Sequence, residues 1–402
     1  MFASLSTRRA RLGPSFGRLR AAVAASSLGD GMRLVALPLL AAQLTADPRQ
    51  IAAVSLAEQL PWLLFGLLAG ALADRWDRRR VLWLVDAARA GVMAALVVAT
   101  VLHATTIVLL VVVGFLLGCG QALYDAAWSA MVPAVVSPPQ FVPANARLQS
   151  SSVVAETLVG TPVGAALFGV AVALPLAVDA SSFAAAALFV LFVRVDRPAV
   201  RDRPVSLRRS MIQGAGWLWR HPLLRRLCLV AGVTNLVGGG LIAMLVLYTR
   251  QVLGLSSVGY GLVVASFAVG GLVGSGLAAR LTSRLGAGRV LRSATAGTAV
   301  AIAVAGAAGS GFVAGAAIAA CGAANLVWNV TAVSLRQRLV PDELLGRVTV
   351  AYRMVAAGAN AIGAAAAGFA ATLTDLRTLF FVWAAMLLAA TLISTKEASS
   401  PE

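Results

Sequence analysis

The sequence predicts an all-α membrane protein of twelve transmembrane helices, arranged as two six-helix bundles. Of the 402 residues, 59% are hydrophobic and only 12% are charged, whereas soluble domains carry roughly 25% charged residues. The mean hydropathy is +0.86. This much apolar surface needs lipid as its solvent.

Twelve apolar runs are long enough to span a bilayer, because crossing a hydrocarbon core of about 30 Å takes about 20 helical residues. The first six runs cover residues 21–44, 51–73, 81–103, 105–132, 148–170 and 172–193. The second six cover residues 223–249, 259–279, 290–309, 311–335, 345–373 and 377–394. The shortest separating turns are expected near Pro175 and Ser310.

One long polar connection divides these runs into two equal sets. Within it, residues 206–220 are predicted either to form an amphipathic helix on the membrane surface or to be a simple basic linker. In the helical case Trp217 and Trp219 would lie at headgroup level. The predicted organisation is a tail at 1–20, a bundle at 21–193, a linker at 194–222, a bundle at 223–394 and a tail at 395–402.

Arginine clusters predict the orientation. The net charge is +17, but the arginines fall in short groups between apolar runs rather than on one basic face, which excludes a nucleic-acid binder. The loops on one side hold most of them, and positively charged loops stay in the cytoplasm. We therefore expect a bacterial inner-membrane protein with both termini cytoplasmic.

Metal and cofactor chemistry is not expected. Cys119, Cys228 and Cys321 stand alone in apolar runs, and His103 and His221 lie at segment ends. This spacing builds no metal site. An enzyme would need histidine, acid, serine or cysteine groups that converge at one depth, and the sequence shows no such set, so we do not expect an enzyme. We also expect a monomer.

The two halves repeat weakly. Polar and aromatic side chains at i, i+3 and i+4 share a helix face. The fourth run carries such a set in Gln121, Tyr124 and Asp125, and the tenth run carries Asn325, Trp328 and Asn329. The loops after the second and eighth runs also match in spacing, which predicts two pseudo-symmetric halves.

The stretch GALADRWDRRR at 70–80 resembles the signature between the second and third helices of the major facilitator superfamily. Further stretches are similar to its bacterial drug- and siderophore-exporting branch, which includes macrolide and enterobactin exporters. They are SLGDGMRLVALPLL (27–40), VSPPQFVPANARL (136–148), GYGLVVASFAVGGLVGSGLAARL (259–281) and LRQRLVPDELLGRVTVAYR (335–353).

The resemblance implies an inner gate at this signature. Asp74 would cap a helix of the opposite half, and Arg78 would pair with Asp125 low on the fourth helix. The full set of gate residues is Gly70, Asp74, Arg75, Asp77, Arg78 and Asp125. The alternative is that these arginines only anchor the loop on the cytoplasmic side. One departure weakens an antiporter assignment: residues 160–165 read GTPVGA, with the proline shifted by one from the superfamily's antiporter motif.

Ionisable residues inside the membrane are functional candidates, because leaving them unpaired there costs several kcal/mol. We interpret Asp86 and Arg89 as a structural ion pair near the cytoplasmic end, and Asp179 as a solvated or capping residue near the outer surface. The remaining acids, all in the first half, are proton-coupling candidates: Asp30 first, then Glu156, and Glu58. The alternative for Asp30 is an internal pair with Arg33.

The resemblance also implies a central cavity lined by the first, fourth, seventh and tenth helices. Aromatic faces with a few amides suit amphipathic ligands, although the same aromatics could simply pack the bundles. The candidates are Arg33, Gln121, Tyr124, Trp128, Asn235, Asn325, Trp328 and Asn329. The resulting expectation is proton-coupled export of amphipathic small molecules, an antibiotic or a siderophore, with lipid, substrate and protons as partners. The alternative is an importer or uniporter of another solute.

Overall fold

In the computed structural model, residues 13–137, 140–193 and 207–393 are described, and every regular element in these ranges is helical. Side chains are not described for 66–75, 129–130, 133–134, 142, 207–212, 342–343 and 393. The first half comprises α1 (Pro14–Leu44), α2 (Pro48–Arg75), α3 (Arg78–Val101), α4 (Ile107–Val135), α5 (Phe141–Val153), the π-helix η2 (Val154–Gly160), α6 (Thr161–Val170) and α7 (Ala173–Leu191). The second half comprises α8 (Leu207–Arg220), α9 (Pro222–Leu247), the π-helix η3 (Tyr248–Val252), α10 (Ser257–Leu285), α11 (Ala287–Ala307), α12 (Gly311–Leu339), α13 (Asp342–Ala370) and α14 (Leu376–Ile393).

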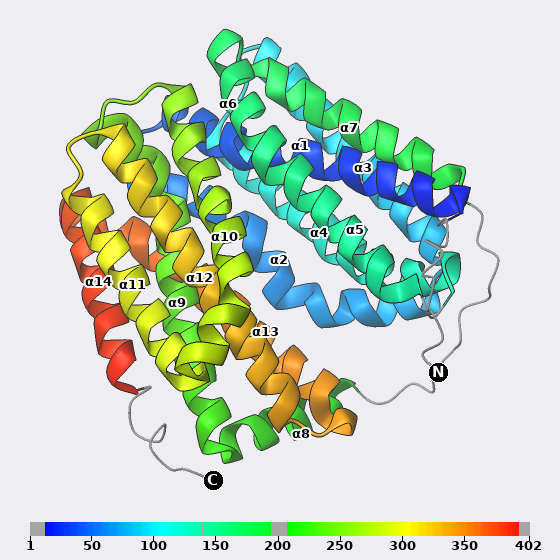
Figure 1. Ribbon diagram of the computed structural model, residues 1–402. Helices are drawn as coiled ribbons and strands as arrows, with labels where there is room; N and C mark the ends of the chain where they lie inside the picture. Colours follow the sequence, from blue (N-terminus) through cyan, green and yellow to red (C-terminus); the bar gives the residue numbers. More distant parts are fainter. Residues whose placement is uncertain (1–12, 138–139, 194–206, 394–402) are drawn as a thin grey trace, which may run out of the picture.

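These helices form the predicted twelve crossings in two bundles (Figure 1). In the described residues, nine helical stretches are long and apolar enough to span a membrane; α5, η2 and α6 count together as one stretch, and α9 with η3 as another. The remaining crossings are α2, α13 and the shorter apolar α14. The helices α2 and α13 pack on each other where the two bundles meet.

The first helix begins earlier than predicted. It starts at Pro14, with proline in the first turn, where a missing N–H costs nothing. Phe16 and Leu19 are buried, while the Arg18 guanidinium donates to the Phe192 carbonyl at 2.9 Å. This first stretch is amphipathic rather than uniformly apolar, so an apolar-run criterion places the start near 21.

The fifth crossing changes from α-helical to π-helical hydrogen bonding in its middle part. Its middle part, η2, has π-helical hydrogen bonding between two α-helical parts. An extra residue per turn of this kind rotates the side chains beyond it relative to a regular helix. The sequence shows the Gly- and Pro-rich segment that follows, but not the π-helix itself.

Two contacts between the bundles are equivalent to each other under the internal repeat. The second crossing, α2, packs on the eleventh, α13, and the fifth, through α6, packs on the eighth, α10. Within the first half, α7 packs on α1 and α3, and α2 packs on α4. Within the second half, α12 packs on α10 and α11, and α9 packs on α13.

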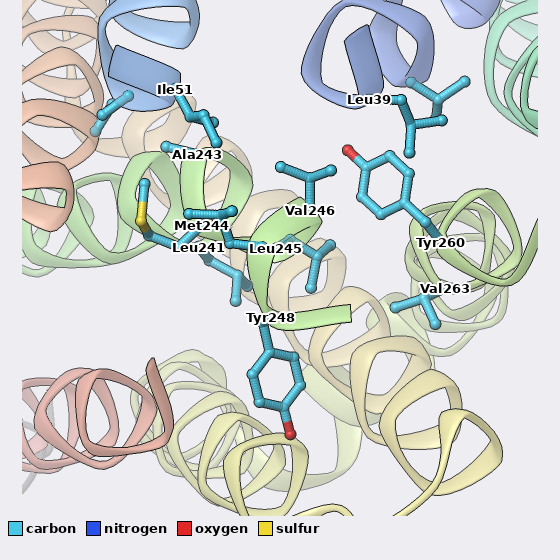
Figure 2. Packing of buried hydrophobic residues seen from close by; sticks show 14 of the residues in the cluster. Leu39, Ile51, Leu241, Ala243, Met244, Leu245, Val246, Tyr248, Tyr260 and Val263 are labelled. Atoms are coloured by element: carbon cyan, nitrogen blue, oxygen red, sulfur yellow. The ribbon is translucent and has the colours of Figure 1, made fainter. Parts of the chain in front are cut away.

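The buried apolar side chains show which end of the molecule is closed. One cluster joins both halves and includes Leu39, Ile51, Val246 and Tyr260; in Figure 2 the Tyr260 ring points toward Leu39, with Val246 beside it. At the other end, where α1 begins and α14 ends, each half has a separate cluster. The halves are therefore sealed together at the end opposite the termini.

Helix α8 lies within the predicted linker at 194–222 and packs on α13. The Arg347 guanidinium donates to the Gln213 side chain at 2.7 Å, and Gly214 leaves room for the Arg347 backbone. The helix predicted at 206–220 is therefore present, held against the second bundle. Residues 194–206 lie outside the described part, so the predicted bundle boundary at 193 stays a prediction.

Candidate functional site

A network of charged side chains lies inside the first bundle, with Arg33 of α1 at its centre. The Arg33 Nη2 donates to Asp30 Oδ1 at 2.8 Å, and its Nη1 donates to the Glu58 carboxylate of α2. Its Nε lies 4.0 Å from Asp179 Oδ2 on α7. The alternative pairing of Asp30 with Arg33 is therefore present, but Arg33 also serves two other helices.

Arg89 of α3 is the second cation of this network. Its Nη2 donates to Asp30 Oδ1 at 2.8 Å and to Gln121 Oε1 at 2.5 Å, whereas its Nη1 lies 3.9 Å from Asp86 Oδ1. Its guanidinium also stacks on the Phe183 ring at 4.2 Å. The predicted Asp86–Arg89 ion pair is present, but Arg89 is 2% exposed and its shortest contacts join α3 to α1 and α4.

Asp179 also differs from the prediction. It was expected near the outer surface, solvated or capping, but its side chain is 0% exposed and faces Arg33. The physical reason is the close approach of α7 to α1 at Gly29, where a Cβ would collide with the Asp179 carboxylate and the Ser182 hydroxyl. Missing side-chain volume on α1 lets α7 cover the carboxylate.

Glu156 stands apart from the other acids. It lies on η2, and among the described residues its carboxylate has no ion pair and no hydrogen bond. Gly31 of α1 allows the approach, since a Cβ there would meet the Glu156 backbone carbonyl. The charged groups that act on this carboxylate through space are Asp30 and Arg33 of α1 and Asp125 of α4.

Arg33 and several of these acids line one cavity of about 370 Å³, whereas Arg89 and Asp179 are not among its lining residues. Asp30, Glu58 and Glu156, the three predicted coupling residues, all line it. Its other walls come from α1, α2, α4, the end of α5 and, in the second half, Ile242 of α9. These lining residues are Val23, Ser26, Ser27, Arg33, Leu34, Pro38, Ser55, Gln59, Gly118, Gln121, Tyr124, Asp125, Trp128, Ser152 and Ile242.

The predicted cavity residues of the first half come together here, while those of the second half do not. Arg33, Gln121, Tyr124 and Trp128 line the cavity. In the second half Asn235 donates to the Ala231 carbonyl of its own helix at 2.8 Å. Trp328 packs in the apolar cluster of the second bundle, as the alternative interpretation had it, Asn325 is half-buried and Asn329 is exposed.

The predicted gate is described only in part. The side chains of Gly70, Asp74 and Arg75 lie outside the described residues, so their gating role stays a prediction. Asp77 accepts a hydrogen bond from the Arg80 backbone N–H at 3.0 Å and thereby caps α3.

The first turn of α3, just after the predicted gate loop, makes one contact that the sequence did not suggest. Arg79 donates to the backbone carbonyls of Val190 and Leu191 at the end of α7. Asp125 accepts from Gln121 Nε2 at 3.0 Å, and its predicted pairing with Arg78 stays a prediction.

The sequence analysis missed the hydroxyl side of the cavity. Ser26 is 2% exposed, lines the cavity, and its Oγ has no hydrogen-bond partner among the described residues. The neighbouring Ser27 shares a hydrogen bond with Ser152 at 2.7 Å. Serines in small-residue stretches carry no sequence signal of this kind, because only the packing of α1 on the fifth crossing shows which of them face the cavity.

Two bundles of membrane-spanning helices, joined at one end around a cavity lined by ionisable residues, define a membrane transporter of the major facilitator type. The family model described as "Transmembrane secretion effector" matches residues 12–400. The chain belongs to this family of the major facilitator superfamily, which is a family of transporters and not of enzymes.

Two efflux proteins are among the relatives. The chain is 28% identical over 242 residues to the multidrug efflux pump Tap of Mycolicibacterium fortuitum, a match that covers 57% of each chain. It is 27% identical over 229 residues to macrolide efflux protein A of Enterococcus faecalis, covering 56% of this chain and 70% of that one. The match to Tap thus spans little more than half of that protein.

Among solved structures, a bacterial homologue of the iron transporter ferroportin in an inward-facing state superposes with a TM-score of 0.77 at 17% identity. The match covers 96% of this chain and 99% of that one. At this identity the likeness shows the fold alone.

Proposed function

We propose that this protein exports amphipathic small molecules from the cytoplasm in exchange for protons. The observation that carries the proposal is Glu156, a carboxylate without a hydrogen bond or ion pair among the described residues, in a cavity lined by the first half and by Ile242 of the second. The names of Tap and macrolide efflux protein A support export as the direction. The arginine-rich loops support a cytoplasmic location of both termini.

The arrangement of the halves fits the first step of export. With both termini in the cytoplasm, the end where the halves are sealed by Leu39, Ile51, Val246 and Tyr260 is the outer one. Substrate then enters the cavity from the cytoplasm or the inner leaflet. Rocking of the two bundles about the cavity would open the outer side.

Glu156 is a better proton carrier than Asp30, the first choice from the sequence. A proton that reaches Asp30 has to displace charge-assisted hydrogen bonds from both Arg33 and Arg89. Glu58 is likewise held by Arg33. The Glu156 carboxylate has no such bond to break, and it faces the cavity through which protons and substrate pass.

The test uses inside-out membrane vesicles with an acidic lumen, and acridine orange as the reporter of the pH gradient. Erythromycin, added outside, should be taken up and should release lumenal protons. Glu156→Gln should abolish this proton release. Asp47→Asn is the matched charge control, because Asp47 lies in the loop between α1 and α2, and the backbone N–H of Arg49 lowers its carboxyl pKa so that it is ionised at neutral pH.

Undiminished proton release by the Glu156→Gln variant would overturn the coupling assignment. Erythromycin uptake that does not depend on the pH gradient would point to a uniporter. Accumulation of erythromycin in intact cells would point to an importer. A screen of drug susceptibility and metabolite export, with the gene deleted and overexpressed, then widens the search beyond erythromycin.

A further inference from the structure

We propose that the cavity selects amphipathic cations, and that Glu156 together with the Ser26 hydroxyl receives the protonated amine of the substrate. The inference rests on the proposed function in placing the substrate in this cavity. It narrows the substrate to one charge class and excludes anionic siderophores.

The first observation is the imbalance of charge around the cavity. Four of the described residues that line the cavity carry carboxylates and one, Arg33, carries a guanidinium, while Arg89 reaches Asp30 from α3. The four acids are Asp30, Glu58, Asp125 and Glu156. An anion entering this cavity meets repulsion from the excess carboxylates, while both arginines already face acids.

The second observation is how unevenly the cavity acids, and the nearby Asp86 and Asp179, are paired with cations and hydrogen-bond donors. Asp30 and Glu58 accept hydrogen bonds from arginine, and Asp125 accepts one from Gln121. Asp86 and Asp179 each face an arginine at about 4 Å. Among the described residues only the Glu156 carboxylate has neither a cation within 4.0 Å nor a hydrogen-bond donor, so it is the place that the cavity leaves for one positive charge.

The third observation is independent of the acids. Ser26 is 98% buried, lines the cavity and leaves its Oγ without a partner, although a buried hydroxyl without a hydrogen bond is unfavourable. The Ser27–Ser152 hydrogen bond joins α1 to the fifth crossing at this level, with Ser152 one turn before Glu156. A protonated amine has N–H groups for both a carboxylate and a hydroxyl oxygen.

The remaining walls accept an apolar body. Val23, Leu34, Pro38 and Ile242 are aliphatic, and Trp128 adds an aromatic face. Such walls bind a hydrophobic ring system, and the aromatic face adds attraction for a nearby cation. The predicted ligand therefore has one amine next to an apolar ring system.

The experiment measures binding to the full-length protein in nanodiscs at neutral pH, without any gradient. The two probes share a naphthalene body: propranolol carries a protonated secondary amine, and naproxen carries a carboxylate. The wild type should bind propranolol more tightly than naproxen. Glu156→Gln should weaken propranolol binding about tenfold or more, since charge-assisted hydrogen bonds are roughly twice as strong as neutral ones, and Ser26→Ala should weaken it a few-fold.

Matched variants separate a binding role from a structural one. Glu156→Asp, which keeps the charge, should retain most of the propranolol affinity, and Asp47→Asn, which removes an exposed loop charge, should leave it unchanged. Equal propranolol affinity in Glu156→Gln and the wild type would overturn the inference, as would tighter binding of naproxen or binding of neither probe. Because no pH gradient is present, these outcomes are independent of proton coupling, so cation selectivity and proton-driven export succeed or fail separately.

Discussion

Arg33 offers the sharpest test of the charged network, because a single guanidinium faces acids on three helices. Its Nη2, Nη1 and Nε point to Asp30, Glu58 and Asp179, respectively. Arg33→Met keeps a long unbranched side chain but removes the charge and all the donors. The change therefore leaves carboxylates of α2 and α7 without their cation, while Asp30 keeps only Arg89.

The size of the effect follows from the burial of the group. The side chains of Arg33 and Asp30 are each 13% exposed, Glu58 is 19% exposed and Asp179 is 0% exposed. Removing one partner of a buried ion pair costs about 3–5 kcal/mol, because the other charge is left uncompensated. We expect a loss of this order, which lowers the ratio of folded to unfolded protein by roughly two to nearly four powers of ten.

The assay is unfolding of the purified protein in a fixed detergent–lipid mixture, followed by circular dichroism during titration with SDS. Arg33→Lys should be intermediate, since one ammonium cannot reach three acids in the directions that a guanidinium allows. The double variant Arg33→Met with Glu58→Gln should recover part of the loss, with a coupling energy of about 0.5–3 kcal/mol. A stability equal to the wild type in Arg33→Met, or a coupling energy of zero, would refute the reasoning.

Two further predictions concern helix packing and the change of state. Gly322→Ala should destabilise the second bundle by about 1–3 kcal/mol, since the new Cβ would strike the Phe267 carbonyl where α12 crosses α10. Gly276→Ala on α10 is the control in the same SDS titration. A Cβ at 276 meets no atom within 4 Å, so the stability of this variant should stay near that of the wild type. The second variant lacks the native cysteines and carries Gly169→Cys of α6 and Ser257→Cys of α10, because a Cβ at 169 would lie 3.1 Å from the Ser257 Oγ. A disulfide between the two new cysteines should seal the outer end and stop uptake until a reductant is added. Undiminished transport by the cross-linked protein would contradict the assignment of that end as a moving gate.

The sequence by itself determined the fold class, because the bilayer leaves few alternatives. Backbone polar groups must be satisfied internally in lipid, so each apolar run long enough to cross becomes a helix. The twelve predicted runs all correspond to helical crossings, with the main differences at the ends and in winding. The same physics marked Asp30, Glu58 and Glu156 as candidates, since an ionisable residue in a membrane segment stands out in one dimension.

Only the tertiary structure decided which of these charges meet. Asp30 and Arg33 are neighbours on one helix face and could be paired from the sequence, but Arg89, Glu58 and Asp179 reach them from three other helices. The burial of Asp179 depends on the missing Cβ of Gly29 on α1. Distance from a helix end, which is what a sequence gives, says nothing about which face a neighbouring helix covers.

The position of Glu156 in the cavity is likewise decided by tertiary packing. Its availability depends on the π-helical winding of Val154–Gly160 and on the approach of that backbone to Gly31, and hydrophobic periodicity detects neither. The closure of the halves at one end also depends on contacts between α2 and α13 and between α6 and α10, far apart in the chain. Local composition places a residue in the membrane, whereas its partners and its exposure to the cavity depend on how separate helices pack.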